Sequence, residues 1–381
     1  MKEIVSEINQ LRFQLHQIAE VSGKEEKTAL FIENELKKCQ PSELKTKIGG
    51  EGLFARFDSG KEGKHIVFRS ELDALPIQEV NTFEHRSNTE GVSHKCGHDG
   101  HMSILLGVAK YLHQNPLKTG SVSLLFQPAE ESGQGAKAML DSGVIQLLEP
   151  IDMFYSLHNI PGHSENEIHC RAGIFTPHVI SLEVKLIGKE SHAAEPENGI
   201  NPATAISEII QGLNQLQNLD KNTNDFKLIT PVFIQMGQEW YGISAGNAVL
   251  GYTIRTWETA VMRQLQRECV QLIERIGSEH NLQLTTHFFE EFNSVVNDPL
   301  AAEQIEKAAQ NVNCAFKQMT YPMNWGEDYG LFTQKYRGAM FGLGAGTAMP
   351  ALHNPDYDFP DQIAESGIKM FVDPIHQNDL L

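Results

Sequence analysis

The sequence predicts an α/β protein in which a second α/β domain is inserted into the first. Three observations lead to this prediction. Buried-strand patterns alternate with an amphipathic helix pattern in the first part of the chain, as in an α/β sheet. After Thr176 the strand patterns alternate apolar and polar residues, which is typical of strands with one solvated face. After Asp298 the first pattern returns.

The length of the chain also favours two domains. A single hydrophobic core usually stops growing well before 381 residues. We expect residues 1–176 and 290–381 to form one discontinuous domain that carries the site, and residues 177–289 to form the inserted domain.

Apolar periodicity predicts the elements in order. Residues 4–39 form two helices, broken near Val21 to Gly23. Strands over residues 65–68 and 121–126 flank a helix over residues 102–113, and a buried strand follows at residues 153–157. The elements expected in the inserted domain are strand 179–187, helix 202–216, strands 228–236 and 249–256, helix 260–278 and strand 282–288.

Composition narrows the function classes. The 49 acidic residues against 31 basic ones give a formal net charge of −18, which repels nucleic acids and anionic membranes. The five cysteines are scattered and never form a C-x-x-C pair, so we expect neither a disulfide framework nor a zinc finger. We also expect no signal peptide and no membrane span, and therefore a cytoplasmic protein.

The densest group of reactive side chains is the segment from His94 to His101, HKCGHDGH. Thiolate and imidazole groups bind zinc-like ions, and the glycines allow a tight turn around such an ion. A buried free cysteine beside surface histidines is the plain alternative. The spacing of Cys96 and His98 directly before an amphipathic helix favours metal binding.

Two adjacent carboxylates, Glu130 and Glu131, follow a hydrophobic strand that ends at Pro128. Neighbouring residues of an extended chain point in opposite directions. One carboxylate could therefore hold a metal while the other addresses the attacking water. A solvated acidic turn is the alternative, and it is common in so acidic a chain.

Two further histidines, His158 and His353, are each expected at the end of a strand of the first domain, where sites of open α/β sheets form. Either could instead be a satisfied core histidine. With Cys96, His98 and Glu131 they make five candidate ligands. A single catalytic zinc takes about three protein ligands and a water, so five ligands favour a two-metal site.

These motifs resemble the co-catalytic metallopeptidase family that includes aminoacylases, hippurate hydrolase and auxin-conjugate hydrolases. The resemblance runs nearly end to end, through Asp73-Ala-Leu-Pro, CGHDGHM from Cys96, FQPAEE from Phe126 and LHNPDYDF from Leu352. It implies a mixed-sheet, zinc-exopeptidase-like catalytic domain with an inserted lid that makes a homodimer. It also implies two divalent ions (zinc, manganese, cobalt or nickel).

The resemblance implies roles for individual residues. Cys96, His98, Glu131, His158 and His353 bind the metals, and Glu130 is the catalytic base. Asp73 orients a ligand imidazole. The residues expected to bind substrate are His192 in GKESHAA, Arg255 in TIRT, and Asn354.

Two positions depart from the family pattern. The usual R-A-D-M-D reads Arg69-Ser-Glu71-Leu-Asp73, so one carboxylate is a methylene longer. Gly242 replaces an asparagine that is usual in the lid. The acyl and amino-acid preferences of the family are therefore not carried over.

The expected reaction is hydrolysis of the amide bond of N-acyl amino acids or related small conjugates by metal-activated water. Three alternatives stay open at this point. They are a single-metal deaminase or deacetylase, a catalytically silent ligand-binding relative, and an enzyme that uses Cys96 as its nucleophile.

Overall fold

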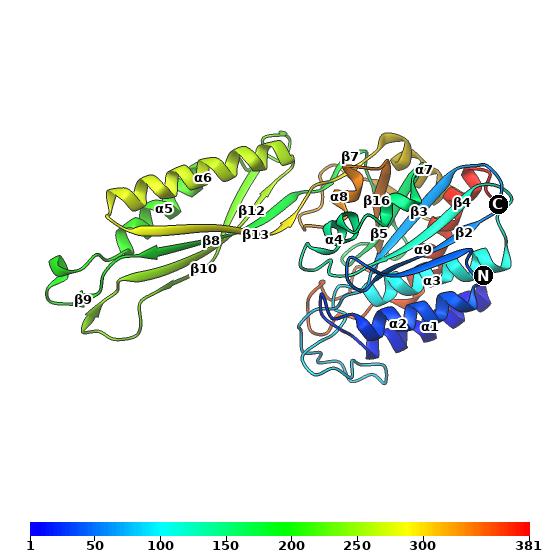
Figure 1. The fold of residues 1–381 in the computed structure, drawn as a ribbon, viewed down its shortest axis with the longest axis horizontal. Helices are drawn as coiled ribbons and strands as arrows, with labels where there is room; N and C mark the ends of the chain where they lie inside the picture. The colour runs from blue at the N-terminus through cyan, green and yellow to red at the C-terminus, as the bar shows by residue number, and fades with distance from the viewer. The chain divides into compact units, whose positions relative to one another are not determined.

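The computed structural model describes the whole chain, Met1–Leu381, and its internal contacts divide the chain into two compact units (Figure 1). The first unit has three segments: Met1–Phe175, Val295–Thr320 and Glu327–Leu381. The second unit has two segments: Thr176–Ser294 and Tyr321–Gly326. None of the helices has the length and apolarity needed to span a bilayer.

A mixed eight-stranded sheet forms the centre of the first unit, in the order β1-β2-β4-β3-β5-β16-β6-β15. Its strands are β1 (Glu43–Ile48), β2 (Gly52–Asp58), β3 (His65–Glu71), β4 (Ser121–Gln127), β5 (Met153–Ile160), β6 (Ile168–Cys170), β15 (Phe316–Gln318) and β16 (Gly338–Gly344). The four central strands β4, β3, β5 and β16 are parallel. Their carboxyl ends therefore meet at one edge of the sheet.

The helices of the first unit are α1 (Lys2–Gln17), α2 (Glu26–Lys38), α3 (His98–Gln114), α4 (Gly135–Asp141), α7 (Pro299–Asn311), α8 (Gly330–Thr333) and α9 (Ala364–Gln377). Short 3-10 helices, η1 (Ile145–Leu148) and η3 (Asp361–Ile363), and short strands, β7 (Gly173–Thr176) and β14 (Val295–Asn297), complete the unit. Helices α1, α2, α3, α7 and α9 share one hydrophobic core with alternate residues of the strands, such as Ile66 and Phe68 of β3. Since alternate strand residues face the same side, these five helices cover one face of the sheet.

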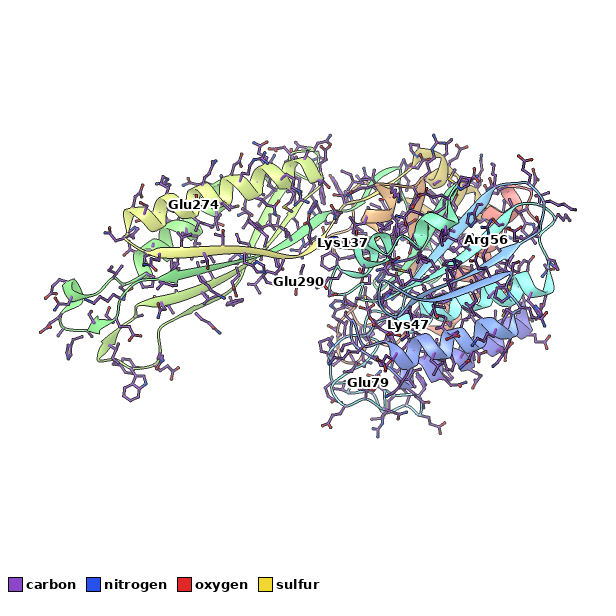
Figure 2. All side chains as sticks on the ribbon, in the orientation of Figure 1. Lys47, Arg56, Glu79, Lys137, Glu274 and Glu290 are labelled. Atoms are coloured by element: carbon purple, nitrogen blue, oxygen red, sulfur yellow. The ribbon has the colours of Figure 1, made fainter.

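The second unit is a two-layer α/β sandwich. Its antiparallel sheet has the order β10-β12-β8-β13, from β8 (His178–Ile187), β10 (Lys227–Met236), β12 (Asn247–Thr256) and β13 (Gln283–Phe292). Short strands β9 (Ser191–His192) and β11 (Ile243–Ser244) form a separate pair. Between them in the chain lie η2 (Pro196–Asn198), α5 (Ala203–Gln215) and β10, and α6 (Thr259–Glu279) follows β12. The apolar faces of α5 and α6 pack on one face of the sheet, while polar residues of α6 such as Glu274 point away from it (Figure 2).

The structure confirms the predicted fold class, and every predicted helix and strand overlaps an observed one. The β1–β2 hairpin was not predicted. Strand β1, ELKTKI, lies at the edge of the sheet and is largely solvated, so it lacks the apolar pattern by which buried strands are found. Strands β6, β9, β11 and β15 have two or three residues each, too few to show a period.

Close packing at the start of α3 gives a testable prediction. A Cβ atom on Gly100 would lie 2.2 Å from Cδ2 of the buried Phe359 ring, and a packed ring cannot move aside as the end of a flexible chain does. We expect Gly100→Ala to destabilise the protein by about 1–3 kcal/mol, measured by urea unfolding. Gly242→Ala is the control, because a Cβ there meets nothing within 4 Å. Equal stability of the two variants would contradict the packing argument.

Candidate metal centre

The five predicted ligands lie at the edge where the parallel strands of the first unit end. Cys96 and His98 lie at the start of α3, and Glu131 lies in the turn after β4. The expectation that both remaining histidines end strands is wrong in detail. His158 lies inside β5 near its end, and His353 lies on the loop that follows β16. All five side chains still reach the edge at which sites of α/β sheets form.

A tight turn presents Cys96 and His98 to the same point. Gly97 between them has a φ of +91°, and a Cβ there would lie 2.6 Å from Oδ1 of Asn159. Only glycine combines that backbone conformation with so close an approach. The His353 loop is fixed to the same turn, because the His353 backbone N–H donates to the carbonyl oxygen of Lys95 (2.8 Å).

The two adjacent carboxylates lie in a turn, and the expectation of an extended chain at this point is wrong. Pro128 follows the end of β4, and Ala129 then adopts a left-handed φ of +51°. The turn is held from outside, since Oδ2 of Asp73 accepts the backbone N–H of Glu131 (3.0 Å). Oε2 of Glu130 and Oε1 of Glu131 both lie 3.9 Å from Nε2 of His98, so both carboxylates reach one site.

The donor atoms converge closely enough to share ions. Sγ of Cys96 lies 3.5 Å from Nε2 of His158, and Nε2 of His353 lies 3.7 Å from Oε2 of Glu131. The donor atoms of Cys96, His98 and His158 all lie within 4.8 Å of one another, as do those of Cys96, Glu131 and His353. Cys96 belongs to both groups. This is the arrangement expected of two ions that share one ligand.

Two of the imidazoles are oriented by backbone carbonyl groups. Nδ1 of His98 donates to the carbonyl oxygen of Asp73 (2.9 Å), and Nδ1 of His158 donates to that of Asn159 (2.8 Å). With Nδ1 carrying the proton, Nε2 presents its lone pair toward the site, as in most metal-binding histidines. The Asp73 carboxylate is farther from His98 (3.5 Å), and its Oδ2 accepts the Ser22 hydroxyl (2.7 Å).

The residues at the site fit a pair of metal ions. Nε2 of His98 and Oε1 of Glu131 are buried and have no hydrogen-bond partner. Leaving a buried polar atom unsatisfied costs about 1–3 kcal/mol, and such atoms are rare unless an ion or water satisfies them. Sulfur, nitrogen and carboxylate oxygen are also the donors that zinc-like ions take.

The electrostatics point the same way. Burial and the nearby carboxylates of Glu131 and Glu130 raise the pKa of the Cys96 thiol. Burial also raises the pKa of Glu131, to about 7. Burial lowers the pKa of His98, but Asp73 and Glu71 outweigh it, and the pKa rises to about 10. The site therefore gathers acidic groups in a largely buried place, and a cation among them would favour the thiolate, the carboxylates and the neutral imidazole of His98.

Glu130 lies beside the donors and is almost completely buried. Burial, with the carboxylates of Glu327 and Glu131, raises the pKa of Glu130 well above the usual value. A buried carboxylate with a raised pKa, placed within reach of a reacting water, is what a general base requires.

A second cluster of buried charges, which was not predicted from the sequence, adjoins the metal donors and supports them. The guanidinium of Arg69 pairs with Glu71, with Glu327 (2.9 Å) and with Asp328 (2.9 Å). Oε2 of Glu71 also lies 2.7 Å from Nδ1 of His101. Burial raises the pKa of Glu71, but Arg69 and His101 hold it well below its usual range. Glu71, which stands where the family usually has an aspartate, therefore links Arg69 to His101 of α3.

Two of the predicted substrate-binding residues, His192 and Arg255, belong to the second unit, and Asn354 belongs to the first. His192 is exposed on β9, and Asn354 is exposed in the turn after His353. Arg255 lies on β12 in the second unit, where its Nη1 donates to the Thr253 hydroxyl (2.9 Å) and its Nε to the carbonyl oxygen of Asn324 (3.1 Å).

Removal of the Glu71 charge tests the supporting cluster. We expect Glu71→Gln to lower the free energy of unfolding by about 3 kcal/mol, because Arg69 loses a buried partner and His101 loses a charged acceptor. Urea unfolding of metal-free protein measures this without a contribution from bound ions. Asp141→Asn is the control, since the Lys137–Asp141 pair is exposed and should be worth about 0.5 kcal/mol or less. Equal losses in both variants would argue against a supporting role of Glu71.

Comparison with known proteins gives the same family as the motifs. The model of peptidase family M20/M25/M40 matches residues 67–377. The N-acetyl-L-cysteine deacetylase of Bacillus subtilis is 31% identical over 340 residues, which cover 87% of this chain and 79% of that protein. The IAA-amino acid hydrolase ILR1-like 4 of Arabidopsis thaliana is 28% identical over 372 residues, covering 94% of this chain and 83% of that one.

A solved structure agrees over the full length. The YxeP protein of Bacillus subtilis, described as a dinuclear metal binding peptidase from the M20 family, superposes with a TM-score of 0.83 and 25% identity, and each chain is covered completely. The resemblance found in the motifs is confirmed: this chain belongs to peptidase family M20/M25/M40 and is a hydrolase that acts on carbon–nitrogen bonds.

Proposed function

We propose that the protein hydrolyses the amide bond of N-acyl amino acids or related small amide conjugates. The observation that supports this most directly is the convergence of five donor side chains in two groups that share Cys96, with the buried Glu130 beside them. Relatives named as an N-acetyl-cysteine deacetylase and an IAA-amino acid hydrolase act on substrates of this class. Both substrates join an acyl group to an amino acid through an amide.

Cys96, His98 and His158 would hold one ion, and Cys96, Glu131 and His353 the other. The ions would supply Lewis acidity that lowers the pKa of water and polarises the amide carbonyl. A thiolate and three imidazoles favour zinc, cobalt or nickel over magnesium or calcium, and manganese remains within the proposal. We also propose a cytoplasmic location, because all five cysteines are free thiols, as is usual in a reducing compartment.

The chain's own groups would move the proton. Glu130 accepts a proton from the attacking water and delivers it to the amine that leaves, so one carboxylate serves as base and then as acid. Asp73 would act by positioning. Its carbonyl oxygen orients the His98 ring, and its carboxylate fixes the turn that carries Glu130 and Glu131.

Substrate recognition would involve His192, Arg255 and Asn354. Arg255 forms no ion pair, and burial lowers its pKa. An arginine without a carboxylate partner suits the carboxylate of an amino acid. Arg255 lines a cavity of about 400 Å³ together with the stacked rings of Phe226 and Trp257, so the bound acid would have an apolar neighbour.

The sharing of Cys96 by two donor groups favours a two-metal enzyme over a single-metal deaminase or deacetylase. The burial of Glu130 beside the donors favours an enzyme over a silent ligand-binding relative, since metal binding alone has no use for this carboxylate. Cys96 as a nucleophile is disfavoured, because its thiol is buried with a raised pKa.

Glu130→Gln tests the proposed base. The variant keeps the size of the side chain but cannot accept the proton, so we expect kcat on N-acetyl amino acids to fall by about 10²-fold or more. Bound metal, measured by elemental analysis, should stay at the wild-type level. Glu274→Gln, on the exposed face of α6, is the control. Near wild-type turnover in Glu130→Gln would remove Glu130 from the mechanism.

We further propose that the second unit makes a homodimer through β10. This strand is an edge of its sheet, and its outer half exposes Val232, Phe233, Ile234 and Met236. A long apolar edge strand presents unpaired backbone N–H and C=O groups, with which a strand of another chain can pair. We propose that the partner is a second copy of this chain, because its own β10 can hydrogen-bond to the unpaired backbone groups of this strand.

A charge on this edge should separate the copies. We expect Ile234→Lys to convert a dimer to a monomer in sedimentation velocity, because paired strands would bury the new ammonium group. Thr285→Lys, an exposed position on the opposite edge strand β13, should leave the dimer intact. A wild-type monomer, or a dimer that survives Ile234→Lys, would contradict the proposal.

A further inference from the structure

A second group of potential metal donors lies in the first unit, on β6 and on the short segment that joins β5 to it. The group consists of His163, Glu167 and His169, and we call it the β6 cluster. One donor atom from each residue lies within 4.8 Å of the others. Nε2 of His169 lies 2.6 Å from Oε2 of Glu167, and the two imidazole rings have centroids 4.2 Å apart. None of these residues belongs to the centre described above.

The backbone holds these donors in place. The segment is tied to the end of β16 by four backbone hydrogen bonds: Gly162 N–H to Gly346 O (3.0 Å), Gly346 N–H to His163 O (2.8 Å), Asn166 N–H to Gly344 O (3.0 Å) and Gly344 N–H to Glu167 O (2.8 Å). His169 is fixed more firmly, because it lies within β6 between β16 and β15 and its side chain is 2% exposed. Binding an ion would therefore cost little ordering of the main chain.

The chemistry of the β6 cluster selects a class of ion. Two imidazoles and one carboxylate are the protein ligands of many open sites for zinc and neighbouring divalent metals, which add water as a further ligand. Glu167 and His163 are partly exposed, so an ion and its water have access. The formal net charge of −18 raises the local concentration of cations around the whole molecule.

The plain alternative is a histidine–carboxylate pair with a second imidazole set edge-on against the first. His280 and Glu208 make such a pair in the second unit, with Nε2 and Oε2 3.0 Å apart. The β6 cluster differs from that pair in its third donor. One feature opposes an ion there: the positive charge of Lys317, which is the register partner of His169 across the β15–β6 ladder. Burial lowers the pKa of His169, and His163 and Lys317 add to this against the opposing effect of Glu167, so the ring stays in the neutral form that binds metals.

We propose that His163, Glu167 and His169 bind one divalent ion of the zinc class, separate from the catalytic pair, which pins the β5–β6 segment to the end of β16. The proposal does not depend on the proposed function, because it concerns residues outside that centre.

Metal content tests it. Holoenzyme saturated with Zn²⁺ and freed of loosely bound ion is analysed for zinc per chain. We expect His163→Asn and Glu167→Gln each to hold one zinc fewer than wild type, whatever number the catalytic centre holds, while His280→Asn holds as many as wild type. Far-UV circular dichroism checks that each variant is folded. Unchanged zinc in both cluster variants, or the same loss in His280→Asn, would overturn the proposal.

Lys317 supplies an independent readout. A monovalent charge beside a divalent ion weakens binding through Coulomb repulsion, so Lys317→Gln should tighten the weakest Zn²⁺ site by roughly threefold or more. Competition against a chromophoric chelator measures this affinity. A histidine–carboxylate pair without an ion gives no such response. An affinity that does not rise in Lys317→Gln would count against the site as decisively as unchanged stoichiometry.

Discussion

The metal centre of the first unit depends on an unfavourable arrangement: a thiol, imidazoles and carboxylates, most of them buried, are held together beside the ends of parallel strands. Nothing in their own hydrogen bonding satisfies Nε2 of His98 or Oε1 of Glu131. The surrounding fold supplies the free energy that holds them there, through the shared core of five helices and the sheet. A site assembled in this way is ready for ions before they arrive, which is the condition for tight and geometrically defined binding.

Rigidity behind the donors comes from charge as well as from packing. Arg69 extends from β3 to carboxylates of β3 itself and of the segment before α8, while Gln127 of β4 accepts from its Nε (2.9 Å). Gln127 also donates to Asp328 (2.8 Å). A buried cation that loses any one partner leaves an uncompensated charge, so the cluster tolerates few arrangements. It thereby fixes the ends of β3 and β4, beside which the donors lie.

Most of the helices and strands could be predicted from the sequence because long segments show a clear hydrophobic periodicity. The five candidate ligands and Glu130 could be proposed from the sequence because their motifs are short and chemically unusual. The Arg69 cluster could not, since Glu327 and Asp328 lie more than two hundred positions away along the chain and look like surface acids. The turn at Ala129 was also missed. A left-handed alanine has no sequence signature, and an extended chain was the simpler reading of FQPAEE.

The burial of Cys96 bears on how the protein would withstand oxidising conditions. Reactive cysteines are exposed thiolates, and oxidants attack the thiolate form. In the metal-free chain Cys96 is 7% exposed and its raised pKa keeps the thiol protonated. Loss of the ions would therefore leave a protonated thiol that reacts slowly with oxidants. The side chain that both ions would share would stay intact until new metal binds.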